Sequence, residues 1–163
     1  MMLFRRRRQR TSPRIKLLEL AVATRYAVSR LGLLAARLKA SYERTGDASL
    51  HQMLRNVLRL QAVLEVLSIR LETLANIGAI SSEDLSIVKK TLLEAKQAYG
   101  IIAPGIASML ADLENMVSSI ASMSGVEVSV TEDPVVNEHV KKILEEAEAV
   151  AEQRLTEIIE KPA

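Results

Sequence analysis

The chain has 163 residues, of which 48% are hydrophobic, 26% are charged and 2% are aromatic, and it contains no cysteine. The lack of cysteine excludes disulfides and thiolate metal sites, and the aliphatic composition with few glycines and prolines favours long helices. The net charge of +2 conceals a division: residues 1–75 hold fifteen Lys/Arg and five Asp/Glu (+10), whereas residues 76–163 hold seven and fifteen (−8). We expect an acidic partner for the first half, and attraction between the halves within or between molecules.

Residues 1–12 combine apolar and basic side chains that no core is expected to cover. The apolar members are Met1, Met2, Leu3 and Phe4, and the basic members are Arg5, Arg6, Arg7, Arg8 and Arg10. Each arginine contributes about 1 kcal/mol beside an anionic lipid surface, and each CH₂ buried among acyl chains contributes about 0.8 kcal/mol. Nucleic acid would attract the arginines but offers the apolar side chains nothing comparable. The segment is therefore predicted to contact an anionic membrane; nucleic acid is the less favoured partner, and a tail that only aids solubility is the simplest alternative.

Two long helical patterns cover residues 13–77. The first has an apolar stripe at Leu17, Leu20, Val28, Leu31, Leu38 and Tyr42, and the second at Met53, Val57, Leu60, Leu64, Leu67, Leu71 and Leu74. Between them, Gly46 suits the left-handed position after a helix, and Asp47 can cap the next one. Two helices of about 30 residues, each about 45 Å long and joined by so short a loop, are predicted to form an antiparallel hairpin.

Side chains outside these stripes support two further predictions. Arg14, Arg25 and Lys39 share one face of the first helix, so they would extend the membrane-binding track beyond residues 1–12. Several apolar residues lie away from both stripes and must be covered by other helices of the chain or by a neighbouring copy. They are Leu18, Val22, Tyr26, Leu33, Leu54, Leu58 and Ile69.

Shorter helices are predicted over residues 81–123, with Ser81 and Asp84 as a capping box and a break at Gly100, Pro104 and Gly105. After the break, a Met-rich apolar face is either core or a re-packable surface for polymer contacts. Its residues are Met109, Leu113, Met116, Ile120 and Met123. Residues 124–133 read as a polar linker, and residues 134–163 as an acidic helix that starts at Pro134.

No pattern in the sequence indicates an enzyme, a metal site or a bound cofactor. The two histidines, His51 and His139, are far apart and lack neighbouring ligands at metal-binding spacing. Glycine-rich phosphate loops, nucleophile elbows and metalloprotease motifs do not occur. The longest uncharged stretch, residues 97–111, is too short for a transmembrane helix, so we expect a soluble or peripheral protein.

In its layout the chain resembles the ESCRT-III family, and in particular its archaeal cell-division members. The textual likeness runs from Leu64 to Ser81 ("LEVLSIRLETLANIGAIS") and from Ala103 to Met116 ("APGIASMLADLENM"). The resemblance implies an all-α fold with a long hairpin, and a cytoplasmic protein on the inner face of the cell membrane, at the division site. It also implies a homo-polymer, or a co-polymer with paralogues, that drives membrane constriction or scission.

The family further implies that an acidic C-terminal region restrains the basic core until assembly. In the family, a AAA ATPase then remodels the polymer after its MIT domain binds a terminal helix. Glu148, Ala151, Arg154, Leu155 and Ile158 fall at the spacing of one such motif, although Ala151 stands where a leucine is usual. A helix that only packs back on the hairpin is the alternative for this segment. For the whole chain, the alternatives are a basic helical protein that binds nucleic acid and a helical adaptor that does not polymerise.

Overall fold

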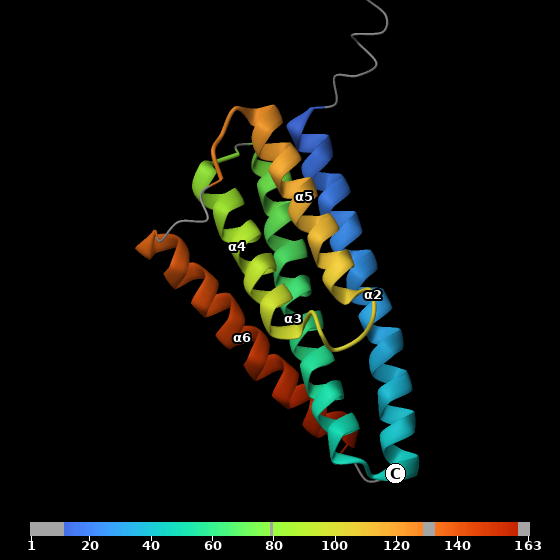
Figure 1. Ribbon diagram of the computed structural model, residues 1–163. Helices are drawn as coiled ribbons and strands as arrows, with labels where there is room; N and C mark the ends of the chain where they lie inside the picture. Colours follow the sequence, from blue (N-terminus) through green and yellow to red (C-terminus); the bar gives the residue numbers. More distant parts are fainter. Residues whose placement is uncertain (1–11, 79, 129–132, 160–163) are drawn as a thin grey trace, which may run out of the picture.

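The computed structural model describes residues 12–78, 80–128 and 133–159, and these form five helices. In chain order they are α2 (Pro13–Thr45), α3 (Ala48–Ile77), α4 (Ser82–Tyr99), α5 (Ile106–Ser124) and α6 (Pro134–Ile159). The described residues contain no strand. The prediction of an all-helical fold is therefore confirmed for this part of the chain (Figure 1).

The helices α2 and α3 lie side by side and antiparallel (Figure 1), joined at Gly46 and Asp47. At the start of α2, the Ser12 hydroxyl accepts a hydrogen bond from the Ile15 N–H. Gly46 ends α2 at φ 67°, a left-handed conformation that a side chain would disfavour. Asp47 caps α3, and the hydrogen bonds from the Ser49 N–H and hydroxyl hold the pKa of the Asp47 carboxyl below its usual value.

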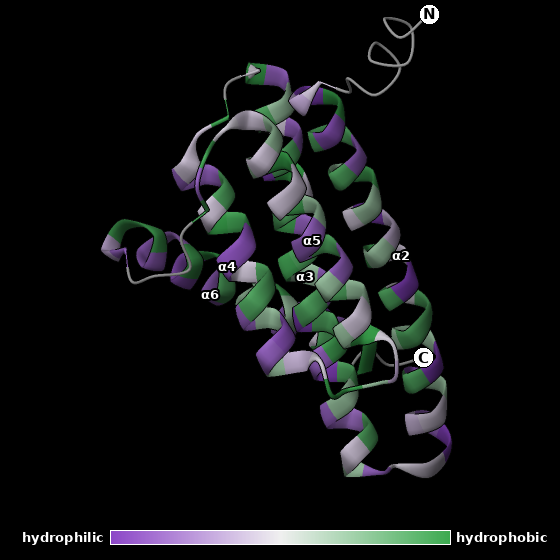
Figure 2. Ribbon diagram, turned by 45° about the horizontal axis from the view of Figure 1, so that its top comes forward, coloured by the Kyte–Doolittle hydropathy of each residue, from purple (hydrophilic) through white to green (hydrophobic). Residues whose placement is uncertain are grey.

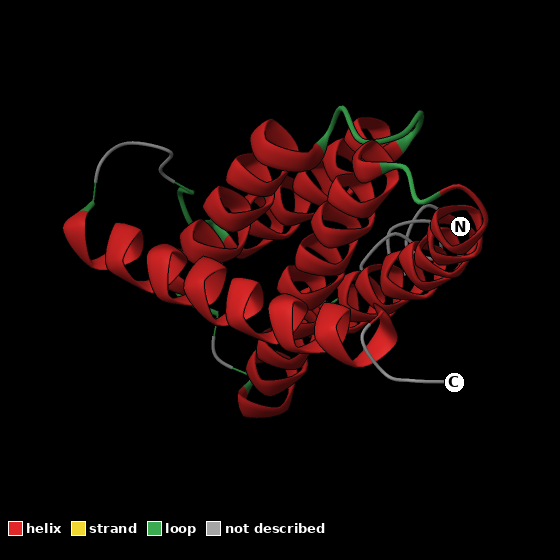
Figure 3. Cartoon of the chain, turned by 90° about the horizontal axis from the view of Figure 1, so that it is seen from below, coloured by secondary structure: helices red, strands yellow, loops and turns green. Residues whose placement is uncertain are grey.

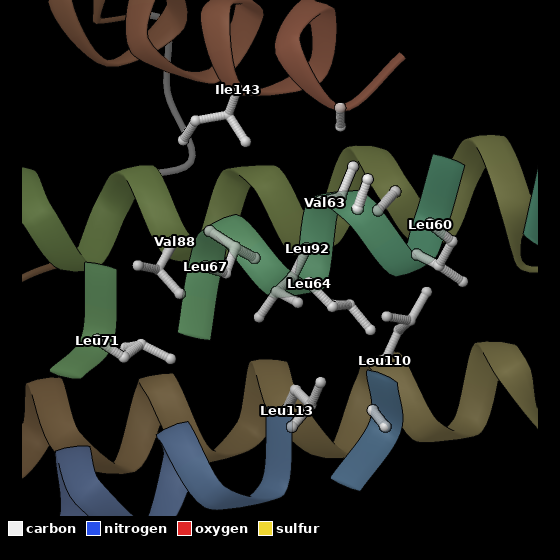
Figure 4. Packing of buried hydrophobic residues seen from close by; sticks show 14 of the residues in the cluster. Leu60, Val63, Leu64, Leu67, Leu71, Val88, Leu92, Leu110, Leu113 and Ile143 are labelled. Carbon is white, nitrogen blue, oxygen red and sulfur yellow. The ribbon is translucent and has the colours of Figure 1, made fainter. Parts of the chain in front are cut away.

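The central helix of the fold is α3, which packs against α2, α4 and α6. Its buried leucines point toward several neighbours at once (Figure 4), because apolar residues occupy more than one side of the helix. Opposite them lie Val88 and Leu92 of α4, Leu110 and Leu113 of α5, and Ile143 of α6 (Figure 4). These residues belong to one continuous hydrophobic core.

The pair α4 and α5 forms the layer beside the upper part of the hairpin (Figure 1). Ser81 caps α4, since its hydroxyl accepts a hydrogen bond from the Asp84 N–H at 3.0 Å. The predicted break is observed between α4 and α5, where Gly105 adopts φ 89° and precedes the first residue of α5. This turn allows α5 to contact both α4 and α2.

The last helix, α6, crosses the bundle obliquely over α3 and α4, and its end approaches the closed end of the hairpin (Figures 1 and 3). Hydrophobic and hydrophilic residues alternate along the helices (Figure 2). Six residues at helical spacing on α6 are buried: Val136, Val140, Ile143, Ala147, Ala151 and Leu155. The acidic helix is therefore amphipathic and part of the core.

The structure answers in part which elements cover the surplus apolar residues. Leu54 and Leu58 are buried within the chain. The others are exposed: Leu18, Val22, Tyr26 and Leu33 on α2, and Ile69 on α3. The described chain therefore covers Leu54 and Leu58 of α3 and leaves Ile69 and the outer side of α2 exposed.

We expect Leu64→Ala to lower the free energy of unfolding by about 2–5 kcal/mol, because Leu64 is fully buried and the truncation leaves a cavity. Ile69→Ala on the same helix is the matched control, since Ile69 is 64% exposed, and it should cost less than about 1 kcal/mol. Urea unfolding followed by circular dichroism measures both. Equal losses in the two variants would contradict the placement of α3 at the centre of the core.

Candidate functional site

The candidate site is the interface at which α6 lies on α3, where opposite charges face each other. Arg55 Nε lies 2.9 Å from Glu152 Oε1. Arg59 Nη2 lies 3.1 Å from Glu148 Oε1 and 3.4 Å from Glu152 Oε1. The two arginines are one helical turn apart on α3, and the two glutamates one turn apart on α6, so the pairs match in register.

A third contact in this interface has the opposite polarity. Arg154 of α6 donates to both carboxylate oxygens of Glu65 on α3, at 3.1 Å from Nη1 to Oε1 and 2.7 Å from Nη2 to Oε2. Such two-pronged pairing fixes the geometry as well as the distance. Arg59 contacts both Glu148 and Glu152, so it could keep one partner if α6 shifted by one turn. The same shift would break the pair of Arg154 with Glu65, so this pair fixes the register.

Small side chains lie between these ion pairs. Ala147 and Ala151 are 1% and 0% exposed, and Leu155 is 4% exposed. Alanine side chains let two helices approach closely, which brings the flanking arginines and glutamates within ion-pairing distance. The apolar residues provide the attraction between the helices and the charges select their alignment.

The α4 helix completes the support of α6. Lys90 donates a hydrogen bond to the side-chain oxygen of Asn137 near the start of α6. Tyr99, at the end of α4, is partly buried, and burial raises the pKa of its phenol; Arg59 lowers it and Glu148 raises it by smaller amounts. The Tyr99 ring thus lies close to the charged end of the α3–α6 interface.

All five residues of the predicted ATPase-binding motif lie in or beside this interface. Glu148 pairs with Arg59, Arg154 pairs with Glu65, and Ala151 and Leu155 are buried. Ile158 is half-buried and packs against the core. In this conformation the motif faces the hairpin, so an external groove could bind it only after α6 has moved away.

The predicted membrane-binding residues are divided between two parts of the chain. Met1 to Arg10 lie outside the described residues. Arg14 donates from Nε to the Ala75 carbonyl at 2.9 Å, and Arg25 forms an ion pair with Glu72. Lys39 lies 3.7 Å from Glu43 and lines a groove of about 500 Å³ together with Arg154 and Ile158.

The predicted polymer-contact face of α5 points largely inward. Leu113 and Ile120 are 3% and 1% exposed, because their spacing places them on the buried side of α5 with Val117. Both residues are therefore core in this conformation, and a role in polymer contacts stays a prediction. Met109 and Met116 are half-buried against the core, and Met123 is 43% exposed.

Sequence reasoning missed the partners of α6 on α3, namely Arg55, Arg59 and Glu65, and also Glu152 on α6. A signal was available in the spacing. Arg55 and Arg59 are four residues apart, as are Glu148 and Glu152. Matching pairs of opposite charge on two amphipathic helices favour a packed pair, but the sequence does not say which helices meet.

The chain matches no known protein-family profile, and no solved structure matches it. Within the described part of the chain, no group of three or more His, Cys, Asp or Glu side chains could hold a metal ion. Nor does any of the five helices combine the length and apolar character needed to cross a bilayer.

We expect the double variant Arg55→Glu with Arg59→Glu to release α6 from α3. Three ion pairs would be replaced by repulsion, and at about 0.2–1 kcal/mol per exposed pair the opening of α6 should become about threefold to 150-fold more frequent. Hydrogen exchange of the α6 amides, compared with those of α3, measures this change.

The control for this prediction is Arg37→Glu with Arg44→Glu on α2, which changes the net charge equally at exposed positions. It should leave exchange in α6 unchanged. Adding Glu148→Arg and Glu152→Arg to the first variant should restore protection. If protection stays lost in that combined variant, the pairing is not what aligns α6.

Proposed function

We propose that this chain is a subunit of a membrane-remodelling polymer that resembles ESCRT-III proteins, with α6 as a helix that restrains assembly. The observation that carries the proposal is the seating of an acidic amphipathic helix on a basic hairpin by paired charges. This arrangement accounts for the division of charge along the sequence, because the same basic and acidic surfaces can pair within one copy or between copies.

The membrane contact in this proposal is residues 1–10, with their four apolar and five basic side chains. They directly precede α2, so binding at a bilayer would place the rod of α2 and α3 close to the lipid surface. The composition suits an anionic leaflet, since arginines are drawn to its charge and apolar side chains insert below the headgroups. The proposed location is the cytoplasmic face of a cell membrane.

Release of α6 is the regulatory step of the proposal. In the closed form α6 covers Arg55 and Arg59 and buries its own apolar edge on α3. Once α6 is released, the basic side of α3 becomes available to an acidic segment of a neighbouring copy. The edge containing Leu155 and Ile158 then becomes available to a groove such as an MIT domain.

We expect the full-length chain to co-sediment with vesicles that contain phosphatidylserine and not with neutral phosphatidylcholine vesicles. Replacing Arg5, Arg6, Arg7 and Arg8 with glutamine should reduce partitioning about a thousandfold, at about 1 kcal/mol per arginine. Replacing Leu3 and Phe4 with serine should also weaken binding. Lys141→Gln with Lys142→Gln is the control, because these lysines are exposed on α6, and it should have little effect.

Binding to duplex DNA in parallel separates the proposal from its nucleic-acid alternative. If DNA binds more tightly than vesicles, and the Leu3 and Phe4 substitutions change nothing, the chain is a nucleic-acid-binding protein.

Filament formation is the second readout of the proposal. The Arg55→Glu, Arg59→Glu variant would release α6, but it would also destroy the basic surface that a neighbouring copy is proposed to bind. The variant for this test is therefore Glu148→Gln with Glu152→Gln. On anionic vesicles it should form filaments in electron micrographs at lower protein concentration than the unaltered chain does. If both chains remain dispersed single particles, the polymer proposal fails and a monomeric adaptor is the better reading.

A further inference from the structure

One side of α2 carries a straight stripe of exposed apolar side chains, interrupted at Ser29 and Arg30, that no helix of the described chain covers. Its members are Ile15 (49% exposed), Leu18 (39%), Val22 (64%), Tyr26 (66%) and Leu33 (64%). Residues 15 and 33 are eighteen positions apart, which is about five turns, so this α2 stripe runs straight along the helix for about 27 Å. In Figure 1, α2 lies at the edge of the bundle.

We propose that a second copy of the chain packs on the α2 stripe, with the two α2 helices antiparallel and related by a two-fold axis. The order of side chains along the stripe is what selects this occupant. With Thr24 at the centre, Ile15 of one copy lies opposite Leu33 of the other, and Val22 lies opposite Tyr26. Four of the five members of the stripe therefore meet apolar partners in the reversed copy, as a two-fold interface requires, and Leu18 lies at the height of Ser29 and Arg30.

The charges beside the stripe fit the same register. Glu19 and Arg30 border the stripe on the same flank of α2. Glu19 lies five positions before Thr24, and Arg30 lies six positions after it. In a two-fold antiparallel pair, equal flanks meet, so Glu19 of each copy faces Arg30 of the other. Two intermolecular ion pairs result.

The remaining cations along the stripe do not oppose this arrangement. Lys16 pairs with Glu19 at 3.1 Å, and Arg25 pairs with Glu72 of its own chain. Arg14 is hydrogen bonded to the Ala75 carbonyl. A lipid surface would gain nothing from the reversible order of the apolar residues or from an acidic side chain at the edge of the stripe, and this favours a second copy over a bilayer.

Cysteine cross-linking tests the register, because the chain has no cysteine of its own. Ile15→Cys and Leu33→Cys, prepared separately and mixed under mild oxidation without lipid, should form a mixed disulfide dimer. Ile15→Cys alone should not, since in the antiparallel pair the two copies of residue 15 are about 27 Å apart and a disulfide needs Cα atoms within about 7 Å.

The control for random collision is Ile15→Cys mixed with Thr156→Cys, an exposed position on α6. The mixed dimer of residues 15 and 33 should form at least about tenfold faster than this control. If the disulfide between residues 15 and 33 forms no faster than the control disulfide, the proposal is wrong. This is the result expected if lipid or residues 1–11 cover the stripe instead of a second copy. Rapid self-coupling of Ile15→Cys would mean a parallel pair and overturns it as well.

Charge reversal supplies a readout that a loosely sticky surface would not give. In the cysteine background, Glu19→Arg alone and Arg30→Glu alone should each slow the cross-link about fivefold to thirtyfold, because two ion pairs of up to about 1 kcal/mol are lost. The two changes together should restore the rate. If the double charge reversal does not restore the rate, the proposed register is wrong. The assay contains no lipid, so its outcome does not depend on whether the membrane proposal holds.

Discussion

The apolar circumference of α3 is the constraint on which the rest of this structure depends. A helix with a single apolar stripe needs one partner, but α3 buries leucines and valines on several sides, including Leu54, Val63 and Leu71. Water contact on any of these sides would be unfavourable, so three helices have to pack around it. The short connection at Gly46 supplies the first of them, α2, and the later parts of the chain supply α4 and α6.

The contact between α3 and α6 combines two kinds of interaction with different roles. Apolar burial at Ala147, Ala151 and Leu155 acts over the whole length and has little preference for one alignment. The ion pairs of Arg59 and Arg154 are partly exposed and individually weak, yet they agree on only one register. Burial of the apolar residues therefore holds α6 on α3, and the ion pairs set its alignment.

Periodicity and turn chemistry predicted most of the fold. The hairpin follows from two long stripes joined at Gly46 and Asp47, and the capping role of Ser81 follows from its spacing to Asp84. What the sequence left open was the choice of neighbours, since an amphipathic stripe does not say which other stripe it meets. The burial of Leu54 and Leu58 within the chain, and the pairing of α6 with Arg55 and Arg59, are facts of this kind.

The candidate site was harder to predict than the fold for the same reason. The residues at motif spacing on α6 were identified by their likeness to a family motif, but Glu65, the partner of Arg154, lies 89 residues from it in the sequence. For α5, the same spacing that marks a contact face also marks a core face. Leu113 and Ile120 are core residues in the structure, and helical periodicity alone does not distinguish a core face from a contact face.

The alanine at position 151 has a consequence for competition over α6. A small side chain suits the close approach of α6 to α3, whereas a groove built to accept a leucine at that position would be left partly unfilled. Any external protein that takes up α6 therefore binds only the fraction of molecules in which the helix is already detached, and its apparent affinity falls in proportion to that fraction. Substituting leucine at position 151 would weaken the packing of α6 on α3 by crowding it. The same leucine would fill the groove of an external protein and so strengthen that contact.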